Sequence, residues 1–504
     1  MLPREPGTHP GPGPRRSPAD GPDPGIAGSP SGAEQTAQAT RTAPAGQGGR
    51  AGQTGQTAAS LTVDRWSLVF VAGLLSFVAM LDMNIVNIAV SSLSRSFGVS
   101  VETAQWAVLG YQLPVVALLL PAGQWLDRAG LRPALLCAIC GFALGSTAAA
   151  VAPSELWLIA ARLLQGTFGA VLFVLMPVLA ARSVRPELRG RAMSVPATLG
   201  PLGAVTGPAL GGLLLDHLGW RAIFLVKLPV CLAALLIARR NVPPGGTLRA
   251  PDRRTLGDAA LIGGAVTAVL LALSLSPGSP FWLLLAVPAG PLAVGWARRP
   301  GGRRVTGVLR DAGTYGIHAA VLALAAGFAA MHYLIALHLQ RDEAVSATTT
   351  GLTVLCFPAA MGLAGPLGGR LADRFGARTP ATAGAAVTAV GLLLLVPLGD
   401  GWTPADVAWR LALAGFGTGL YGGPVQALVM SAAPPERMAT AGSAVQLARS
   451  LGFTLGPALA TAVWALGGAD SGGVRAGLAL AALGAGAAAV LLLRSGLRPA
   501  APAG

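Results

Sequence analysis

Long apolar runs constrain this chain more than any other feature. From Trp66 onward, runs rich in Leu, Ala and Val alternate with short loops that carry arginine. About 20 apolar residues are needed to cross a hydrocarbon core of roughly 30 Å. Only helices or closed barrels satisfy the backbone polar groups there. The runs lack the period-2 alternation of strands, so they predict an all-α integral membrane protein.

About fourteen spans are expected, an even number. They lie near 67–90, 104–123, 134–152, 156–178, 192–213, 222–238, 256–275, 281–297, 315–339, 349–368, 381–397, 408–432, 439–463 and 474–493. The composition agrees, because only 11% of the residues are charged and 53% are hydrophobic. A soluble chain carries about 25% charged residues.

The arginines predict the orientation. Lys227 is the single lysine, so 35 of the 36 basic residues are arginine. Alternate loops and ends hold 22 arginines on one side of the predicted membrane and 4 on the other. The positive-inside rule places the arginine-rich side and both termini in the cytoplasm of a plasma membrane protein. The net charge of +15 therefore reflects topology, and no nucleic-acid partner is expected.

The chain repeats itself. The segment 123–132 recurs at 369–378, an offset of 246 residues, and Gly207-Pro208 recurs at Gly456-Pro457, an offset of 249. Two homologous halves with a site near the midplane between them are typical of transporters. The expected organisation is a disordered tail (1–64), a six-helix half (65–240), a two-helix insert (241–311), a second six-helix half (312–498) and a tail (499–504).

Four motifs resemble the major facilitator superfamily, and more narrowly its fourteen-span drug:proton antiporters. They are the Gly-x-x-x-Asp-Arg-x-Gly-x-Arg loop at 123–132, the first-span segment 81–89, the fourth-span segment 162–169 and the fifth-span antiporter segment 200–212. The chain departs from the family at Ser91, where proline is usual, and at Lys227, where asparagine is usual. The resemblance covers about 65–495 and implies the major facilitator fold and proton-coupled export.

Asp82 is the only acid well inside a predicted span. A carboxylate there costs about 2.5–3.5 kcal/mol on insertion scales, which favours a functional role such as carrying a proton. The alternative is a satisfied buried acid, bonded to Asn84 or to a neighbouring helix. The resemblance implies a role in proton coupling for Arg162, whose alternative is snorkelling to the outer interface. Asn84, Asn87 and Gln165 complete the predicted coupling and substrate site.

Three further groups of residues are candidates. The first is a cytoplasmic gate, or else a plain topology determinant: Gly123, Asp127, Arg128, Gly130, Arg132, Asp373 and Arg374. The second is a close-packed, kinked helix, or else ordinary packing: Gly200, Gly203, Gly207, Pro208, Gly211 and Gly212. The third is a set of possible cavity residues: Tyr111, Gln112, Lys227, His318 and His332. Lys227 is expected to snorkel outward, and the histidines to serve packing or a proton relay.

Enzyme signatures are missing from the sequence. It has no phosphate-binding Gly-x-x-x-x-Gly-Lys loop and no Cys/His pattern with zinc spacing, so no cofactor or metal is expected. We expect a monomeric, proton-driven exporter of small hydrophobic compounds such as drugs or antibiotics. The alternatives are a dedicated exporter of one natural product, siderophore or amino acid, and a non-transporting membrane receptor or assembly factor.

Overall fold

The computed structural model describes residues 64–275, 279–339, 343, 345–397, 402–466 and 471–495. Apart from Asp64, the two predicted tails (1–64 and 499–504) lie outside the described residues. The first eight helices are α1 (Trp66–Phe97), α2 (Val101–Ala104), α3 (Trp106–Leu126), α4 (Leu131–Ala150), α5 (Glu155–Arg182), α6 (Arg189–Leu218), α7 (Trp220–Leu225) and α8 (Leu228–Asn241).

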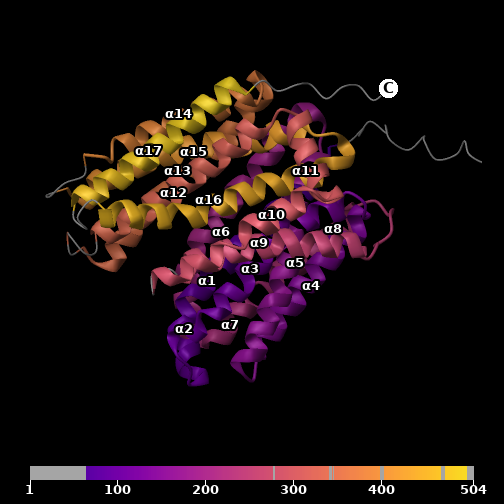
Figure 1. Ribbon diagram of the computed structural model, residues 1–504, viewed down its shortest axis with the longest axis horizontal. Coiled ribbons are helices and arrows are strands. Elements are labelled where there is room, and N and C mark those ends of the chain that lie inside the picture. The colour runs from indigo at the N-terminus through magenta and orange to yellow at the C-terminus, as the bar shows by residue number, and fades with distance from the viewer. Residues whose placement is uncertain are drawn as a thin grey trace, which may run out of the picture. The chain divides into compact units, whose positions relative to one another are not determined.

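The remaining helices fill the insert and the second repeat (Figure 1). They are α9 (Arg253–Leu275), α10 (Ala289–Ala297), α11 (Pro300–Asp311), α12 (Tyr315–Leu337), α13 (Ala347–Phe375), α14 (Arg378–Leu393), α15 (Pro404–Ala432), α16 (Met438–Leu466) and α17 (Ser471–Arg494). Short 3-10 turns occur at Pro186–Leu188, Pro280–Ala286 and Pro435–Arg437.

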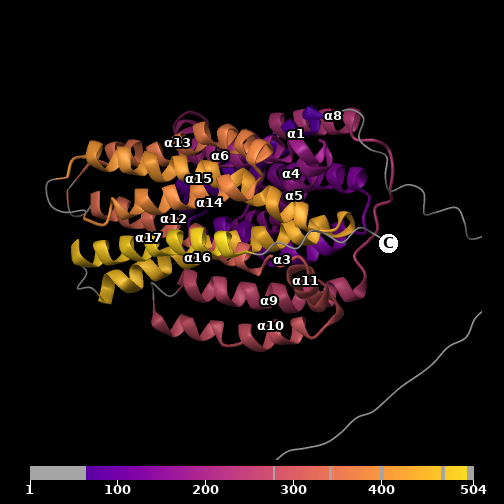
Figure 2. The same cartoon turned by 90° about the horizontal axis from the view of Figure 1, so that it is seen from above.

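The helix contacts follow the sequence repeat. In the first repeat α1 packs on α6 and α3 on α5, and in the second α12 packs on α16 and α13 on α15. The two repeats meet through the pairs α3–α16 and α6–α13. Since α13 is the repeat counterpart of α3 and α16 that of α6, the two pairs are equivalent contacts. Figure 2 shows α9 and α10 running side by side, and α9 also packs against α3 and α16.

Ten of the described helices are long and apolar enough to cross a membrane, or eleven if one bent pair counts as a span. The predicted number of fourteen is therefore not confirmed, although helices occupy all fourteen predicted positions. With the bent pair counted, the three remaining predicted spans are α14, α15 and α16. Helix α14 has only 16 residues, and α15 and α16 contain many Gly, Thr, Ser and Gln residues. Such residues lower the mean hydropathy but favour close helix packing.

Two local features depart from the expectation. The segment 300–311 was expected to be a loop, but it forms α11. This helix is bent by 82° from the preceding segment Phe281–Ala297. Its Val305 and Val308 are buried while Arg303 and Arg304 are exposed, so it is amphipathic. The predicted span 222–238 is divided between α7 and α8 at Val226–Lys227. Pro229, which lacks a backbone N–H, follows within the first turn of α8 and accounts for the break.

Candidate functional site

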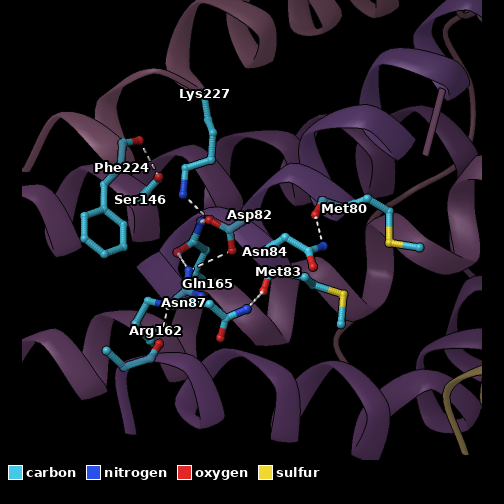
Figure 3. Close-up of polar contacts among 11 residues, drawn as sticks. Met80, Asp82, Met83, Asn84, Asn87, Ser146, Arg162, Gln165, Phe224 and Lys227 are labelled. Atoms are coloured by element: carbon cyan, nitrogen blue, oxygen red, sulfur yellow. Dashed lines mark hydrogen bonds and ion pairs between the residues drawn. The ribbon is translucent and has the colours of Figure 1, made fainter. Parts of the chain in front are cut away.

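A buried ion-pair cluster lies halfway along α1. Asp82 stands 16 residues after the start of this helix, and its side chain is fully buried. Arg162 of α5 donates from Nη1 to Asp82 Oδ2 at 2.7 Å, and the ammonium of Lys227 donates to Oδ1 (Figure 3). Both cations are also fully buried. The break between α7 and α8 places Lys227 where it can reach Asp82.

Gln165 links the acid and the arginine. Its Nε2 donates to Asp82 Oδ1 at 3.2 Å, and its Oε1 accepts from Arg162 Nη1 at 2.8 Å. Asp82, Arg162, Gln165 and Lys227 are called the Asp82 cluster below. Arg162 Nε also donates to the Ala107 carbonyl at 2.8 Å. These bonds leave Arg162 Nη2 without a hydrogen-bond partner among the described residues.

Aromatic rings cover the cluster. The Arg162 guanidinium lies 4.5 Å from the centroid of the Tyr111 ring and 5.7 Å from that of Phe224. The ammonium of Lys227 lies 5.0 Å from the same Phe224 centroid. Cation–π attraction strengthens where water is excluded. The rings therefore stabilise two cations that share one carboxylate.

The charge of the Asp82 cluster is unbalanced. One carboxylate and two cations give a formal charge of +1 in a fully buried place. Isolated buried charge is costly, and a group with an exchangeable proton can relieve it by changing its protonation state. The arrangement can therefore release or accept a proton.

The structure corrects the expected direction of Lys227 and the alternative in which Asn84 bonds to Asp82. Asn84 and Asn87 do not reach Asp82, because their amides donate to Met80 O at 2.8 Å and Met83 O at 3.2 Å in their own helix (Figure 3). Lys227 does not snorkel outward, since its side chain is fully buried against Asp82. A side chain one turn inside a span can point to water or to the core, and only the packing of α7 and α8 decides which.

The other possible cavity residues lie elsewhere. Gln112 is partly buried beside Tyr111 in the chain. On α12, His318 Nδ1 donates to Thr314 O at 2.8 Å and His332 Nδ1 to Phe328 O at 3.1 Å. The His332 ring also stacks on Phe328, with the centroids 4.2 Å apart. These contacts hold both rings against their own helix, as packing requires.

The predicted gate residues join the two repeats. Asp127, just after α3, accepts hydrogen bonds from Ala439 N at 2.9 Å, Thr440 N at 3.1 Å and Thr440 Oγ1 at 2.5 Å. It therefore caps the first turn of α16 in the other repeat, where a negative charge also meets the positive end of the helix dipole. Burial is the dominant effect on this carboxyl and raises the pKa of Asp127 to about 6.

Asp373 repeats this arrangement at the start of α6. It accepts from Arg191 N at 3.3 Å and pairs with the Arg191 side chain, also at 3.3 Å. Gly123 is required for the first docking, because a Cβ there would lie 2.3 Å from Ser443 Oγ. Gly369, its counterpart, would meet the Gly190 carbonyl at 2.8 Å. In each repeat, one acid and one glycine therefore contact the other repeat.

The remaining loop residues differ between the copies. Arg128 pairs with Asp252 at 3.6 Å on the surface, and Arg132 donates to Arg239 O at 2.9 Å. Gly130 N donates to the Thr247 carbonyl at 3.1 Å, and Arg374 stacks on its neighbour Phe375, with its guanidinium 5.1 Å from the ring centroid. These arginine contacts lie within one repeat or with the loop that follows the first repeat.

Four glycines of α6 lie on α1. A Cβ at Gly203 would be 2.2 Å from Phe77 O, and one at Gly211 would be 2.9 Å from Ile85 Cγ1. Gly200 and Gly207 also face α1 at short range, whereas a Cβ at Gly212 would meet nothing within 4 Å. Gly212 is therefore wrongly included in the stripe. The helix continues through Pro208, which is exposed.

A third cation within a span, partly buried, was not predicted from the sequence. Arg449 lies on α16, and its Nη2 donates to Gln426 Oε1 of α15 at 3.3 Å. Tyr421 of α15 is nearby and only 4% exposed. The signal was present, because Arg449 stands inside the predicted span 439–463, as Arg162 stands inside 156–178.

Comparison with known proteins identifies the family. The family model described as Major Facilitator Superfamily matches residues 72–295 and 317–504. The chain belongs to this superfamily. The multidrug resistance protein Stp of Mycobacterium tuberculosis is 31% identical over 78% of this chain and 74% of its own length. The probable actinorhodin transporter of Streptomyces coelicolor is 29% identical over 84% of this chain and 77% of its own length.

The fold agrees with that assignment. The crystal structure of the human organic anion transporter MFSD10 matches with a TM-score of 0.60 and 19% identity, covering 85% of this chain and 99% of that one. At this identity the match shows the shared fold alone. The superfamily and the efflux type of its relatives make the chain a multi-pass membrane transporter and not an enzyme.

Proposed function

We propose that the protein is a proton-coupled exporter of small hydrophobic compounds, such as drugs or antibiotics, across the cytoplasmic membrane. The observation that carries this proposal is the Asp82 cluster, a buried and charge-unbalanced ion-pair network halfway along α1. Intramembrane ionisable groups of this kind mark substrate and proton pathways. Similarity to proteins named for multidrug resistance supports the export direction.

The topology belongs to the same proposal. Fourteen crossings, with α14, α15 and α16 counted as spans, place both termini in the cytoplasm of a plasma membrane protein. The 22-to-4 arginine distribution supports this orientation. The caps that Asp127 and Asp373 form across the repeats then act as a cytoplasmic gate, and rocking of the two repeats gives alternating access.

Charge arithmetic favours Lys227 as the group that exchanges the proton. If Lys227 releases a proton, the remaining Asp82–Arg162 pair is neutral. If Asp82 instead takes up a proton, two buried cations face no anion. Arginine stays protonated under all relevant conditions. In this scheme Asp82 holds the lysine and Arg162 keeps Asp82 ionised, while Lys227 alternates between charged and neutral states.

Lys227→Arg tests this assignment, because arginine keeps the positive charge but does not titrate. Reconstituted into proteoliposomes with an imposed pH gradient, this variant should lose uphill export of a neutral hydrophobic compound such as chloramphenicol. Asp82→Asn should lose it as well. Uphill export by Lys227→Arg at the parent rate would move proton exchange away from Lys227. Full uphill export by Asp82→Asn would remove the whole cluster from coupling.

A dedicated exporter of one natural product is the second candidate. It is supported by the 29% identity to a probable actinorhodin transporter. A resistance profile of cells expressing the chain separates the two. Protection against several unrelated compounds favours multidrug export, whereas protection against a single one favours a dedicated exporter.

A further inference from the structure

The second repeat holds an intramembrane cation that the Asp82 cluster does not include. Arg449 stands 11 residues into α16, or about 17 Å along the helix at 1.5 Å per residue. That is about half of a hydrocarbon core of roughly 30 Å. Its hydrogen bond to Gln426 Oε1 is to a neutral amide, and no carboxylate lies within 4.0 Å of it among the described residues.

A polar group near Arg449, the Tyr421 hydroxyl, lacks a hydrogen-bond partner among the described residues. Tyr421 is 4% exposed, and its hydroxyl has no hydrogen-bond partner in the described part of the chain. Gln426 is 8% exposed. A buried polar group without a partner costs about 1–3 kcal/mol, and more when it is charged. Arg449 and Tyr421 would both be satisfied by one acceptor with a negative charge.

The helix face of Arg449 borders helices of both repeats. Gly442, seven residues earlier, lies on nearly the same face, because seven residues make almost two turns. A Cβ there would be 2.8 Å from Met430 of α15 and 3.5 Å from Pro177 of α5. Arg449 itself is partly exposed, unlike Tyr421 and Gln426. Gly456, seven residues later, lies on the same face and docks on α12, so this face of α16 borders α12, α15 and α5. Charged side chains at this depth face the bundle interior or a water-filled cavity and not lipid, so the exposed part of Arg449 faces a polar space inside the bundle.

Packing alone does not require an arginine at this position. Gly452 and Gly456 of α16 dock on α12, where a Cβ would lie 2.5 Å from Leu322 O and 2.3 Å from Ala326 O. Their counterparts Gly203 and Gly207 dock on α1 in the same way. At the repeat offset of 249, Arg449 corresponds to Gly200. The first repeat thus solves the packing with glycine, and the charge in the second needs another reason.

We propose that Arg449, Tyr421 and Gln426 form a subsite for the anionic group of the transported compound, an organic carboxylate. This inference rests on the proposed function, since it names the substrate class of the same transporter. The guanidinium and the phenol hydroxyl donate to the carboxylate, and Gln426 orients the guanidinium. The formal charge of +1 on the Asp82 cluster adds to the attraction for an anion.

A matched pair of probes tests the subsite. Salicylate and its neutral amide, salicylamide, have nearly the same size and shape. In isothermal titration calorimetry of the purified full-length protein in detergent, the parent should bind salicylate more tightly. Arg449→Gln should weaken salicylate binding about 10- to 100-fold, as expected for a charge-assisted hydrogen bond. Salicylamide binding should not change.

Three variants sharpen the result. Arg449→Lys should retain part of the preference for the anion, and Tyr421→Phe should weaken salicylate binding several-fold. Arg410→Gln is the control, because Arg410 donates to Asp406 O of its own helix and stacks on Trp402. It should bind salicylate as the parent does. Monodispersity and melting temperature verify that each variant is folded.

Several outcomes would overturn the subsite. They are absence of salicylate binding, equal binding of the two probes by the parent, unchanged salicylate binding by both Arg449→Gln and Tyr421→Phe, or an equal loss in Arg410→Gln. Export is measured separately in proteoliposomes. Binding that depends on Arg449 without proton-driven export would retain the subsite and reject the proposed function. Proton-driven export together with salicylate binding that Arg449→Gln leaves unchanged would reject the subsite and retain the proposed function.

Discussion

At the scale of single residues, Lys227 changes the character of the Asp82 cluster. The arginine already neutralises Asp82, at 2.7 Å, so the lysine adds a second buried cation. Breaking a buried pair by removing one partner is strongly destabilising, because it leaves an uncompensated charge. The stability of the protein should therefore report the charge balance of the cluster directly.

This balance gives a prediction for paired variants. Asp82→Asn should destabilise the fold by about 3–5 kcal/mol, since two cations lose their carboxylate. Adding Lys227→Gln should restore part of the loss, because one of the two stranded charges disappears. Thermal unfolding of the purified variants measures both effects. If the double variant is less stable than Asp82→Asn by the full cost of Lys227→Gln alone, the two residues are not coupled.

At the scale of elements, the glycine face of α6 sets how closely this helix approaches α1. Gly203 has no room for a side chain beside Phe77 O, and Gly212 on the same helix has open space. Close approach of two helices replaces side-chain contacts by backbone contacts, as is common in membrane proteins. One helix therefore contains both a critical glycine and its own control.

Gly203→Ala should lower stability by about 1–3 kcal/mol, because the added methyl group forces α1 and α6 apart. Gly212→Ala should be neutral or slightly stabilising, since alanine favours helix by about 1 kcal/mol over glycine. The melting temperatures of the two purified variants provide the comparison. Equal melting temperatures would show that α6 and α1 adjust to the methyl group without cost.

At the scale of the whole molecule, three polar links join the two repeats at their arginine-rich ends. Asp127 caps α16, Asp373 caps α6, and Arg182 donates to the Pro435 carbonyl at 2.7 Å. All three must break if the repeats separate at this end. Opening and closing there should consequently depend on the protonation state of the acids that form the links.

Asp127 should make closing sensitive to acid. Burial raises its pKa from 3.8 to about 6 in the closed arrangement, and opening would expose the carboxyl and return the pKa toward 3.8. The closed form then binds more protons between these values, so lowering the pH from about 6 to 4 should favour closure. Distances between spin labels at Ala129 and Arg437 measure the closed fraction.

Asp127→Asn should abolish this dependence on pH, because the amide does not titrate. Asp252→Asn is the matched control from the neighbouring loop. Hydrogen bonds from Thr255 lower the pKa of Asp252 below its ordinary value, so it stays ionised in the same range. A pH dependence that survives in Asp127→Asn, or one that vanishes in Asp252→Asn, would contradict the assignment.

The all-helical membrane class and the internal repeat could be predicted from the amino-acid sequence alone. Hydropathy and the arginine pattern are local sums over neighbouring residues, so they identify helical spans without knowledge of their packing. The cost of burying charge singled out Asp82 before any contact was visible, and the family resemblance pointed to Arg162. The same reasoning would have found Arg449 if it had been applied to every predicted span.

Which of these residues are in contact depends on how the helices pack. Lys227 is 145 positions from Asp82 in the chain, and their contact depends on a helix break at Pro229. Gly212 was wrongly placed with the glycines that face α1, because the direction of a side chain is fixed by the rotation of its helix against a neighbour. That rotation is a property of packed pairs of helices, and no single stretch of sequence contains it.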